Sequence, residues 1–154
     1  MPDANIKVLP KATLLKILKN SIGSKIFNSL VVHYQDSGEI KDILEDGTKS
    51  CAFFVTSILA LLGLIDKPHT TVKTALEKLS ANGWRESGNI QPGDVLVWEK
   101  KRFSDGSENE HIGFALSAKE AVSTSYIKKK IIKHGADFNG KRRLTAIFRY
   151  PFAE

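Results

Sequence analysis

The chain has 154 residues, of which 42% are hydrophobic, and this length supports one domain with a proper core rather than two. The formal net charge is +6 at pH 7 and there is a single cysteine, Cys51, which rules out an internal disulfide and leaves a thiol that can react. The longest apolar run, residues 52–65, falls short of a membrane span, so we expect none.

The N-terminal third of the sequence is dominated by a helical pattern. Apolar residues recur at three- and four-residue spacing from Lys11 to about Val32, and Gly23 is expected to divide them into two helices. We therefore predict that residues 1–33 are an N-terminal helical extension of a single domain spanning 1–154. The polar segment that follows is predicted to be a loop, with one short helical turn at Ile40–Leu44.

Two further helices are predicted before the pattern changes. One begins near Ser50, with Thr48 or Ser50 as its N-cap, and is apolar on every side, so it should lie in the centre of the domain. Cys51 then falls in its first turn. The other is amphipathic and ends at Asn82-Gly83, and its apolar stripe consists of Val72, Ala75, Leu76 and Leu79.

After Trp84 the spacing of apolar residues is typical of strands. The predicted strands are "GDVLVWE", "HIGFALS", "EAVSTSYI", "KIIKHG" and "RRLTAIFRYP". Helices followed by a run of short strands indicate an α+β fold. We expect the central Cys-bearing helix to pack on an antiparallel sheet of about five strands. Trp84 and Trp98 are expected in the core or in a groove wall, and Asp94 in a turn.

Cys51 is the candidate nucleophile of this sequence. The thiolate is the reactive form of cysteine, and a helix N-terminus favours the anion, so we expect a lowered thiol pKa. A base is also required. His33 ends the N-terminal helical region and His69 is predicted to lie in a surface loop, whereas His111 opens a strand that follows a polar loop. His111 is therefore the candidate base.

The order of a Cys-bearing central helix, an amphipathic helix, "QPGDVLVW" and "HIGFAL" resembles the NlpC-like branch of the papain-like cysteine peptidases and amidases. The match covers roughly residues 48–125. The resemblance implies that Cys51 is the nucleophile, that His111 is the general base, and that the Cys51 N–H contributes to the oxyanion hole. The family usually has Asp-Cys-Ser-Gly at the nucleophile, where this chain has Ser50-Cys51-Ala52-Phe53.

In the resemblance, the third polar residue that orients the imidazole lies on the strand after the histidine strand. Ser123, Thr124 and Ser125 fall there, with Ser123 and Ser125 on one face and Thr124 on the other. Ser123 is our first choice. His134 and Asp137, from the following strand, are alternatives.

The sequence thus predicts a cysteine hydrolase that cleaves an amide or peptide bond through an acyl-enzyme, without a cofactor or a metal. The resemblance implies peptidoglycan stem peptides as one candidate substrate. The alternative is a non-catalytic binding module whose basic segment, residues 128–143, holds an anionic partner through Lys128, Lys129, Lys130, Arg142 and Arg143. No signal peptide is recognisable, which predicts a cytoplasmic location and leaves export by another route open.

Overall fold

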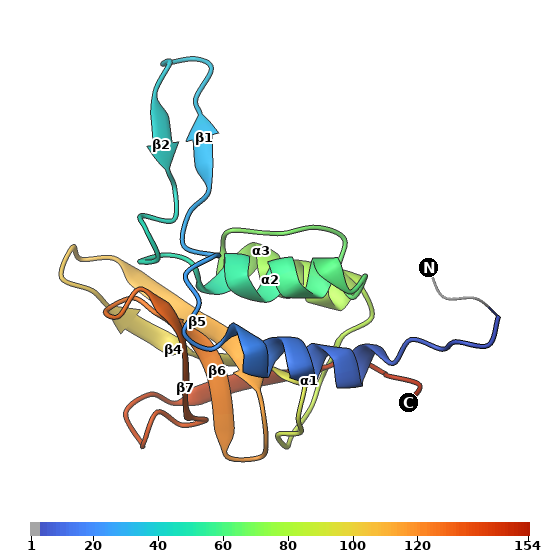
Figure 1. Ribbon diagram of the computed structural model, residues 1–154. Coiled ribbons are helices and arrows are strands. Elements are labelled where there is room, and N and C mark those ends of the chain that lie inside the picture. Colours follow the sequence, from blue (N-terminus) through green and yellow to red (C-terminus); the bar gives the residue numbers. More distant parts are fainter. Residues whose placement is uncertain (1–3) are drawn as a thin grey trace.

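A six-stranded antiparallel sheet is the centre of this computed structural model, which describes residues 4–154 (Figure 1). Its strand order is β3-β8-β4-β5-β6-β7. The five predicted strands are β4 to β8, and the sixth is the two-residue β3 that pairs with β8, so the sheet exceeds the expected count of about five. The strands are β3 Arg85–Glu86, β4 Val95–Arg102, β5 Glu108–Ala115, β6 Glu120–Ser125, β7 Lys130–Gly135 and β8 Leu144–Arg149.

Three helices are present in the described residues: α1 Pro10–Ser21, α2 Cys51–Leu61 and α3 Val72–Ala81. Helix α2 begins at Cys51, as predicted, and packs on the sheet in the centre of the main core (Figure 1). The Phe54 ring meets the Phe114 ring of β5 edge to face, with centroids 5.8 Å apart. An apolar helix of this kind has to bury most of its surface, which explains its position, although Leu61 at its last position is 75% exposed.

The structure corrects the predicted N-terminal helical extension. Only α1 is helical in this part of the described chain, and a two-stranded hairpin replaces the second helix and the loop. This hairpin, β1 Val31–His33 and β2 Ile40–Asp42, projects away from the sheet and helices (Figure 1). The short helical turn predicted at Ile40–Leu44 is therefore wrong, because strand β2 begins there.

Asp42 anchors the base of the hairpin. Its carboxylate accepts hydrogen bonds from the backbone N–H groups of Asp46, Leu30 and Leu44, at 2.9–3.0 Å, and from the Ser29 hydroxyl at 2.8 Å. These donors, with the Asp46 N–H acting most strongly, lower the pKa of Asp42 to about 2. One side chain thus ties the residues just before β1 to those just after β2, which helical spacing in the sequence does not reveal.

The face of the sheet opposite α2 carries a second, smaller core. It is built around Trp98, whose indole N–H donates to the Ala136 carbonyl at 2.7 Å. Trp84 belongs to the main core and donates to the Leu64 carbonyl at 2.8 Å. Both tryptophans are thus buried, as predicted.

None of the helices within residues 4–154 is long and apolar enough to cross a membrane.

Candidate active site

Cys51 is the first residue of α2 and is half-buried. Ser50 takes the N-cap position, but its hydroxyl donates to the Gly47 carbonyl at 3.2 Å instead of capping the helix. Burial raises the pKa of the Cys51 thiol, while the Ile112 N–H and, more weakly, the Arg142 charge act in the opposite direction. The expected lowering is therefore wrong, because burial outweighs the effect of the helix N-terminus, and the resting group is a neutral thiol.

His111 lies in the middle of β5 rather than at its opening. Its ring is half-buried and packs against Trp98 and Phe138, with centroid distances of 5.5 and 5.9 Å. Burial, assisted by the positive charge of Arg142, lowers the pKa of His111 to about 3. The imidazole is therefore neutral near pH 7, and one of its ring nitrogens is available as a proton acceptor.

A chain of hydrogen bonds joins His111 to a second histidine. His111 Nε2 lies 2.9 Å from Ser123 Oγ, and Ser123 Oγ lies 2.7 Å from His134 Nε2. At the far end, His134 Nδ1 lies 2.8 Å from the Gly135 carbonyl oxygen. We call this arrangement the His–Ser–His chain.

The Gly135 carbonyl sets the direction of every bond in the His–Ser–His chain. A carbonyl oxygen can only accept, so His134 must carry its proton on Nδ1, which makes its Nε2 an acceptor. The Ser123 hydroxyl then donates to His134 and accepts from His111 Nε2–H. Because the pKa of His134 is also lowered, mainly by burial, this neutral tautomer is the resting one. His111 Nδ1 is left with a lone pair, which is the geometric requirement for a general base, while the low pKa of His111 makes it a weak proton acceptor in the absence of substrate.

Of the candidates for the residue that orients His111, Ser123 and His134 belong to the His–Ser–His chain. Ser123 is 0% exposed and touches both histidines, and His134 is connected to His111 through it. The Ser125 hydroxyl instead accepts from the Lys128 N–H at 3.0 Å, and the Asp137 carboxylate accepts from the Asn139 N–H at 3.0 Å. Thr124 lines the groove described below, without a hydrogen bond to His111 in the described residues.

Gly113 lets β5 and β6 approach closely beside this chain. A Cβ added there would lie 2.6 Å from the Val122 carbonyl oxygen and 2.8 Å from the Ser123 Cβ. Real side chains do not tolerate such contacts, so only glycine fits without a shift of the backbone. The small residue in "HIGFAL" therefore has a steric cause, and it keeps Ser123 within reach of His111.

Cys51 and His111 border one groove of about 960 Å³. Strands β5 and β6 are paired at Phe114–Val122 and Ala115–Ala121. The groove opens beyond these pairs, where the two strands part. By strand alternation, His111 lies on the side of β5 opposite to Ile112, which packs in the helix-side core. Within residues 4–154 no hydrogen bond joins the Cys51 thiol to the His111 ring. Such contacts are often long in the absence of substrate.

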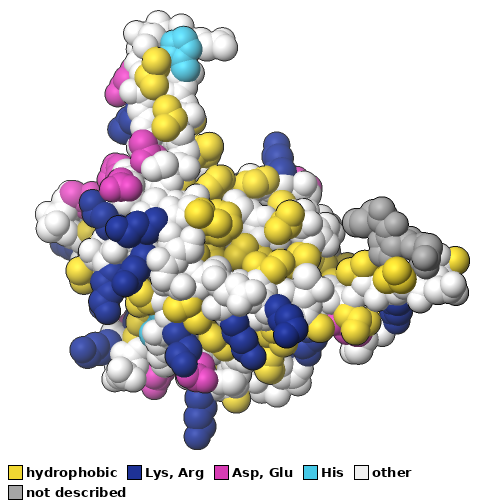
Figure 2. Space-filling view, viewed as in Figure 1, with side chains coloured by type: hydrophobic (Ala, Val, Ile, Leu, Met, Phe, Trp, Pro, Cys, Tyr) yellow, Lys and Arg dark blue, Asp and Glu magenta, His cyan; other side chains and the backbone are white. Residues whose placement is uncertain are grey.

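The groove is strongly basic. Seven Lys and Arg residues line it, against two Glu residues. Figure 2 shows part of this surface, where Lys and Arg side chains gather below the projecting hairpin. Of the residues predicted to hold an anionic partner, Lys128 and Arg142 line the groove; the others, Lys129, Lys130 and Arg143, are not among its lining residues.

The two remaining histidines lie elsewhere. His69 is 8% exposed, so the expected surface position is wrong. Its backbone N–H donates to the Thr56 hydroxyl of α2 at 2.8 Å, and its ring contacts Asp66 at 3.1 Å, which explains the burial. His33 is in β1 and not at the end of a helix.

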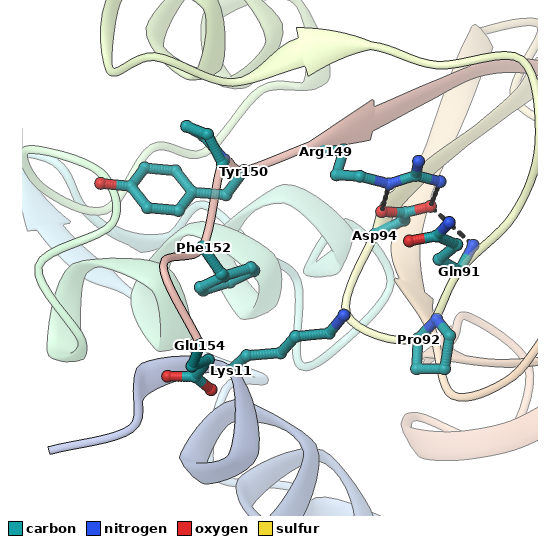
Figure 3. A pocket seen from close by; sticks show the side chains of 9 residues that line it. Lys11, Gln91, Pro92, Asp94, Arg149, Tyr150, Phe152 and Glu154 are labelled. Carbon is teal, nitrogen blue, oxygen red and sulfur yellow. Dashed lines mark hydrogen bonds and ion pairs between the residues drawn. The ribbon is translucent and has the colours of Figure 1, made fainter.

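A second pocket of about 210 Å³ lies between α1, the turn before β4 and the residues after β8 (Figure 3). Asp94 is 2% exposed and makes a two-pronged ion pair with Arg149, at 2.8 and 2.9 Å. It also accepts from the Gln91 N–H at 2.7 Å, so it locks the start of β4 to the end of β8 in addition to its turn position. This pocket brings together no nucleophile and base, and we assign it a structural role.

Within residues 4–154 no group of three or more His, Cys, Asp or Glu side chains is arranged to hold a metal ion. Neither a protein-family model nor a curated protein sequence matches the chain. The chemistry of the groove therefore has to be inferred from its own residues.

Proposed function

We propose that the protein is a cysteine hydrolase that cleaves an amide or peptide bond through an acyl-enzyme. The observation that carries the proposal is the His–Ser–His chain, which fixes the tautomer of His111 and leaves Nδ1 with a free lone pair, on a residue that lines the same groove as Cys51. A hydrogen-bonded chain of this kind, with Ser123 fully buried at its centre, orients the His111 ring, and orientation is what the third member of a catalytic triad supplies. The resemblance to NlpC-like, papain-like enzymes supports the same assignment.

The proposed reaction starts from neutral groups. His111 Nδ1 takes the Cys51 proton as Sγ attacks the carbonyl carbon, and the negative charge moves to the carbonyl oxygen. The N–H groups at the start of α2, including that of Cys51, are the donors we propose for this oxyanion. The C–N bond then breaks, the amine takes the proton from Nδ1, and a thioester remains on Cys51. Water attacks the thioester, gives its proton to His111, and the acid leaves as the proton returns to Sγ.

The test is release of amines from defined amide substrates. Soluble peptidoglycan stem peptides, which the resemblance suggests, and a set of short peptide amides would be incubated with wild-type protein and with Cys51→Ala and Cys51→Ser. We expect the wild type alone to release amine, and intact-mass measurements to show an acyl adduct on Cys51. The proposal is contradicted if the variants, folded as judged by unchanged thermal unfolding, release amine at the wild-type rate.

The second candidate is a binding module, and the basic lining of the groove favours it. A module of this kind should hold its anionic partner equally well after Cys51→Ala. Its affinity should fall steeply with salt, because phosphate or carboxylate contacts by Lys and Arg displace counter-ions. A hydrolase loses turnover with the same variant, so the two candidates are separated by one substitution.

A further inference from the structure

Arg142 is a buried cation without a counter-ion in the described part of the chain. It is 7% exposed, and its Nε and Nη2 donate to the carbonyl oxygens of Glu99 and Asn109 at 2.9 and 2.8 Å. The Glu99 carboxylate does not pair with it, and lies 3.6 Å from the exposed Arg143 instead. A buried charge is costly unless it is paired, so an unpaired guanidinium beside a groove points to a missing anion.

One nitrogen of Arg142, Nη1, is free to bind such an anion. Within residues 4–154 Nη1 donates no hydrogen bond. It is also not fully enclosed, because the only enclosed side-chain polar atom without a hydrogen-bond partner in the described residues is Ser57 Oγ. Nη1 is therefore accessible, and the accessible space next to Arg142 is the groove that holds Cys51 and His111. The other two nitrogens are fixed by neutral carbonyls, which hold the guanidinium plane in place without using its charge.

We propose that Arg142 binds a carboxylate of the substrate, so that the hydrolase acts on acidic peptides or amides whose carboxylate lies next to the scissile carbonyl. This inference rests on the proposed function and adds the substrate class to it. Exposed lysines on the same rim, Lys101, Lys128 and Lys141, form no ion pair in the described residues and attract the same sign of charge. The part of the basic segment that lines the groove, with Lys128, Lys141 and Arg142, and the Cys–His pair then form a single site.

A bound carboxylate also removes an obstacle to the chemistry. The Arg142 charge opposes protonation of His111, which must carry the proton of Cys51 during attack. A carboxylate on Nη1 neutralises that charge at the moment the base is needed. The same charge favours ionisation of Cys51, so its neutralisation acts in opposite directions on the base and the nucleophile, and the preference for an acidic substrate rests on the contact with Arg142 itself.

The test uses two alkylating reagents of nearly the same size, iodoacetate, which is anionic, and iodoacetamide, which is neutral. In both reactions the Cys51 sulfur forms a bond to the CH₂ carbon, iodide leaves, and the thiol proton passes to His111 or to solvent. The rate of each is followed at Cys51 by peptide mass spectrometry. We expect the ratio of the iodoacetate rate to the iodoacetamide rate to be about tenfold higher in the native protein than in the urea-unfolded chain.

Variants assign the preference to one residue. Arg142→Gln should return the ratio to the value of the unfolded chain, and Arg142→Lys should keep most of the preference. The matched control is Arg143→Gln, which removes the neighbouring exposed charge and should leave the ratio unchanged. An equal fall in Arg142→Gln and Arg143→Gln overturns the assignment, because general surface charge would then be the cause.

Two further results keep the test decisive. If Arg142→Gln does not fold, the wild-type ratio is measured from about 20 mM to about 500 mM sodium chloride, which shortens the screening length severalfold. A ratio that falls with salt toward the unfolded value supports the proposal, and a native ratio equal to the unfolded one at every salt concentration overturns it. Failure of the proposed function is recognised separately, since Cys51-dependent release of amine would then be absent whatever the ratio of the two alkylation rates.

Discussion

Replacement of Ser123 by alanine tests the His–Ser–His chain at its centre. The hydroxyl is fully buried and sits 2.9 Å from His111 Nε2 and 2.7 Å from His134 Nε2. Its loss leaves one ring N–H without an acceptor and one ring nitrogen without a donor. Each such group costs about 1–3 kcal/mol when buried, and since both rings are only half-buried we expect a loss of about 2 kcal/mol in the free energy of unfolding.

The same variant should slow Cys51 because the His111 proton is no longer held on Nε2. Once the two tautomers are comparably populated and the ring can rotate, we expect alkylation of Cys51 by iodoacetamide near pH 7 to slow by roughly tenfold, equivalent to about 1.4 kcal/mol. The matched control is Ser125→Ala, on the same strand, whose hydroxyl contacts the Lys128 N–H. Equal stability in urea and equal alkylation rates for Ser123→Ala and Ser125→Ala would contradict the role of Ser123 in orienting His111.

Three further changes follow from the geometry. Gly113→Ala places a Cβ 2.6 Å from the Val122 carbonyl oxygen, so we expect the free energy of unfolding, measured in urea, to fall by about 1–3 kcal/mol. An unchanged urea midpoint would contradict the close approach of β5 and β6. Asp94→Asn breaks the two-pronged ion pair with Arg149 and should lower the free energy of unfolding in urea by about 2 kcal/mol. The control is Glu77→Gln, on the exposed side of α3, and an equal effect of both variants would contradict the role of the ion pair. Both histidines of the chain have lowered pKa values in the folded state, so below about pH 6.5 the unfolded state takes up protons that the folded state does not. Their contribution to stability is therefore complete above about pH 6.5 and is lost as pH falls, for His111 by up to about 1.4 kcal/mol per pH unit down to about pH 3, and His134 adds to the loss in the same direction. Urea unfolding between pH 7.5 and pH 4.5 measures this loss, His111→Gln should reduce the slope, and equal slopes would contradict the burial of the ring.

The sequence was most informative where a local pattern decides the structure. An apolar run after Ser50 places Cys51 at the first position of α2, and period-two alternation places His111 and Ser123 on strands β5 and β6. The link between Ser123 and His134 depends on the β6–β7 register, in which Ser123 faces Ile132 and His134 lies two residues further along on the same face. Register is a property of pairing between strands, so the sequence left Ser123 and His134 as competing alternatives, whereas in the structure they are hydrogen-bonded to each other.

Other features were missed because their cause lies far away in the chain. Asp94 and Arg149 are brought together by the β4–β8 pairing, across 55 positions in the sequence. The hairpin β1–β2 was hidden by apolar spacing that also fits a helix, and its stabilising contacts come from Asp42, beyond the turn. The raised thiol pKa depends on how much of Cys51 is covered, which the position at a helix start does not determine.

The most direct test of the account is the pH dependence of Cys51 alkylation by iodoacetamide in the wild type and in His111→Gln. In the proposed reaction the neutral Cys51 thiol passes its proton to His111. We therefore predict that the wild type reacts about tenfold faster than the variant near pH 7, and that the two rates converge at high pH, where the thiol ionises by itself. Equal rates at every pH, or a Cys51 that reacts only after unfolding, would contradict the proposed Cys51–His111 pair.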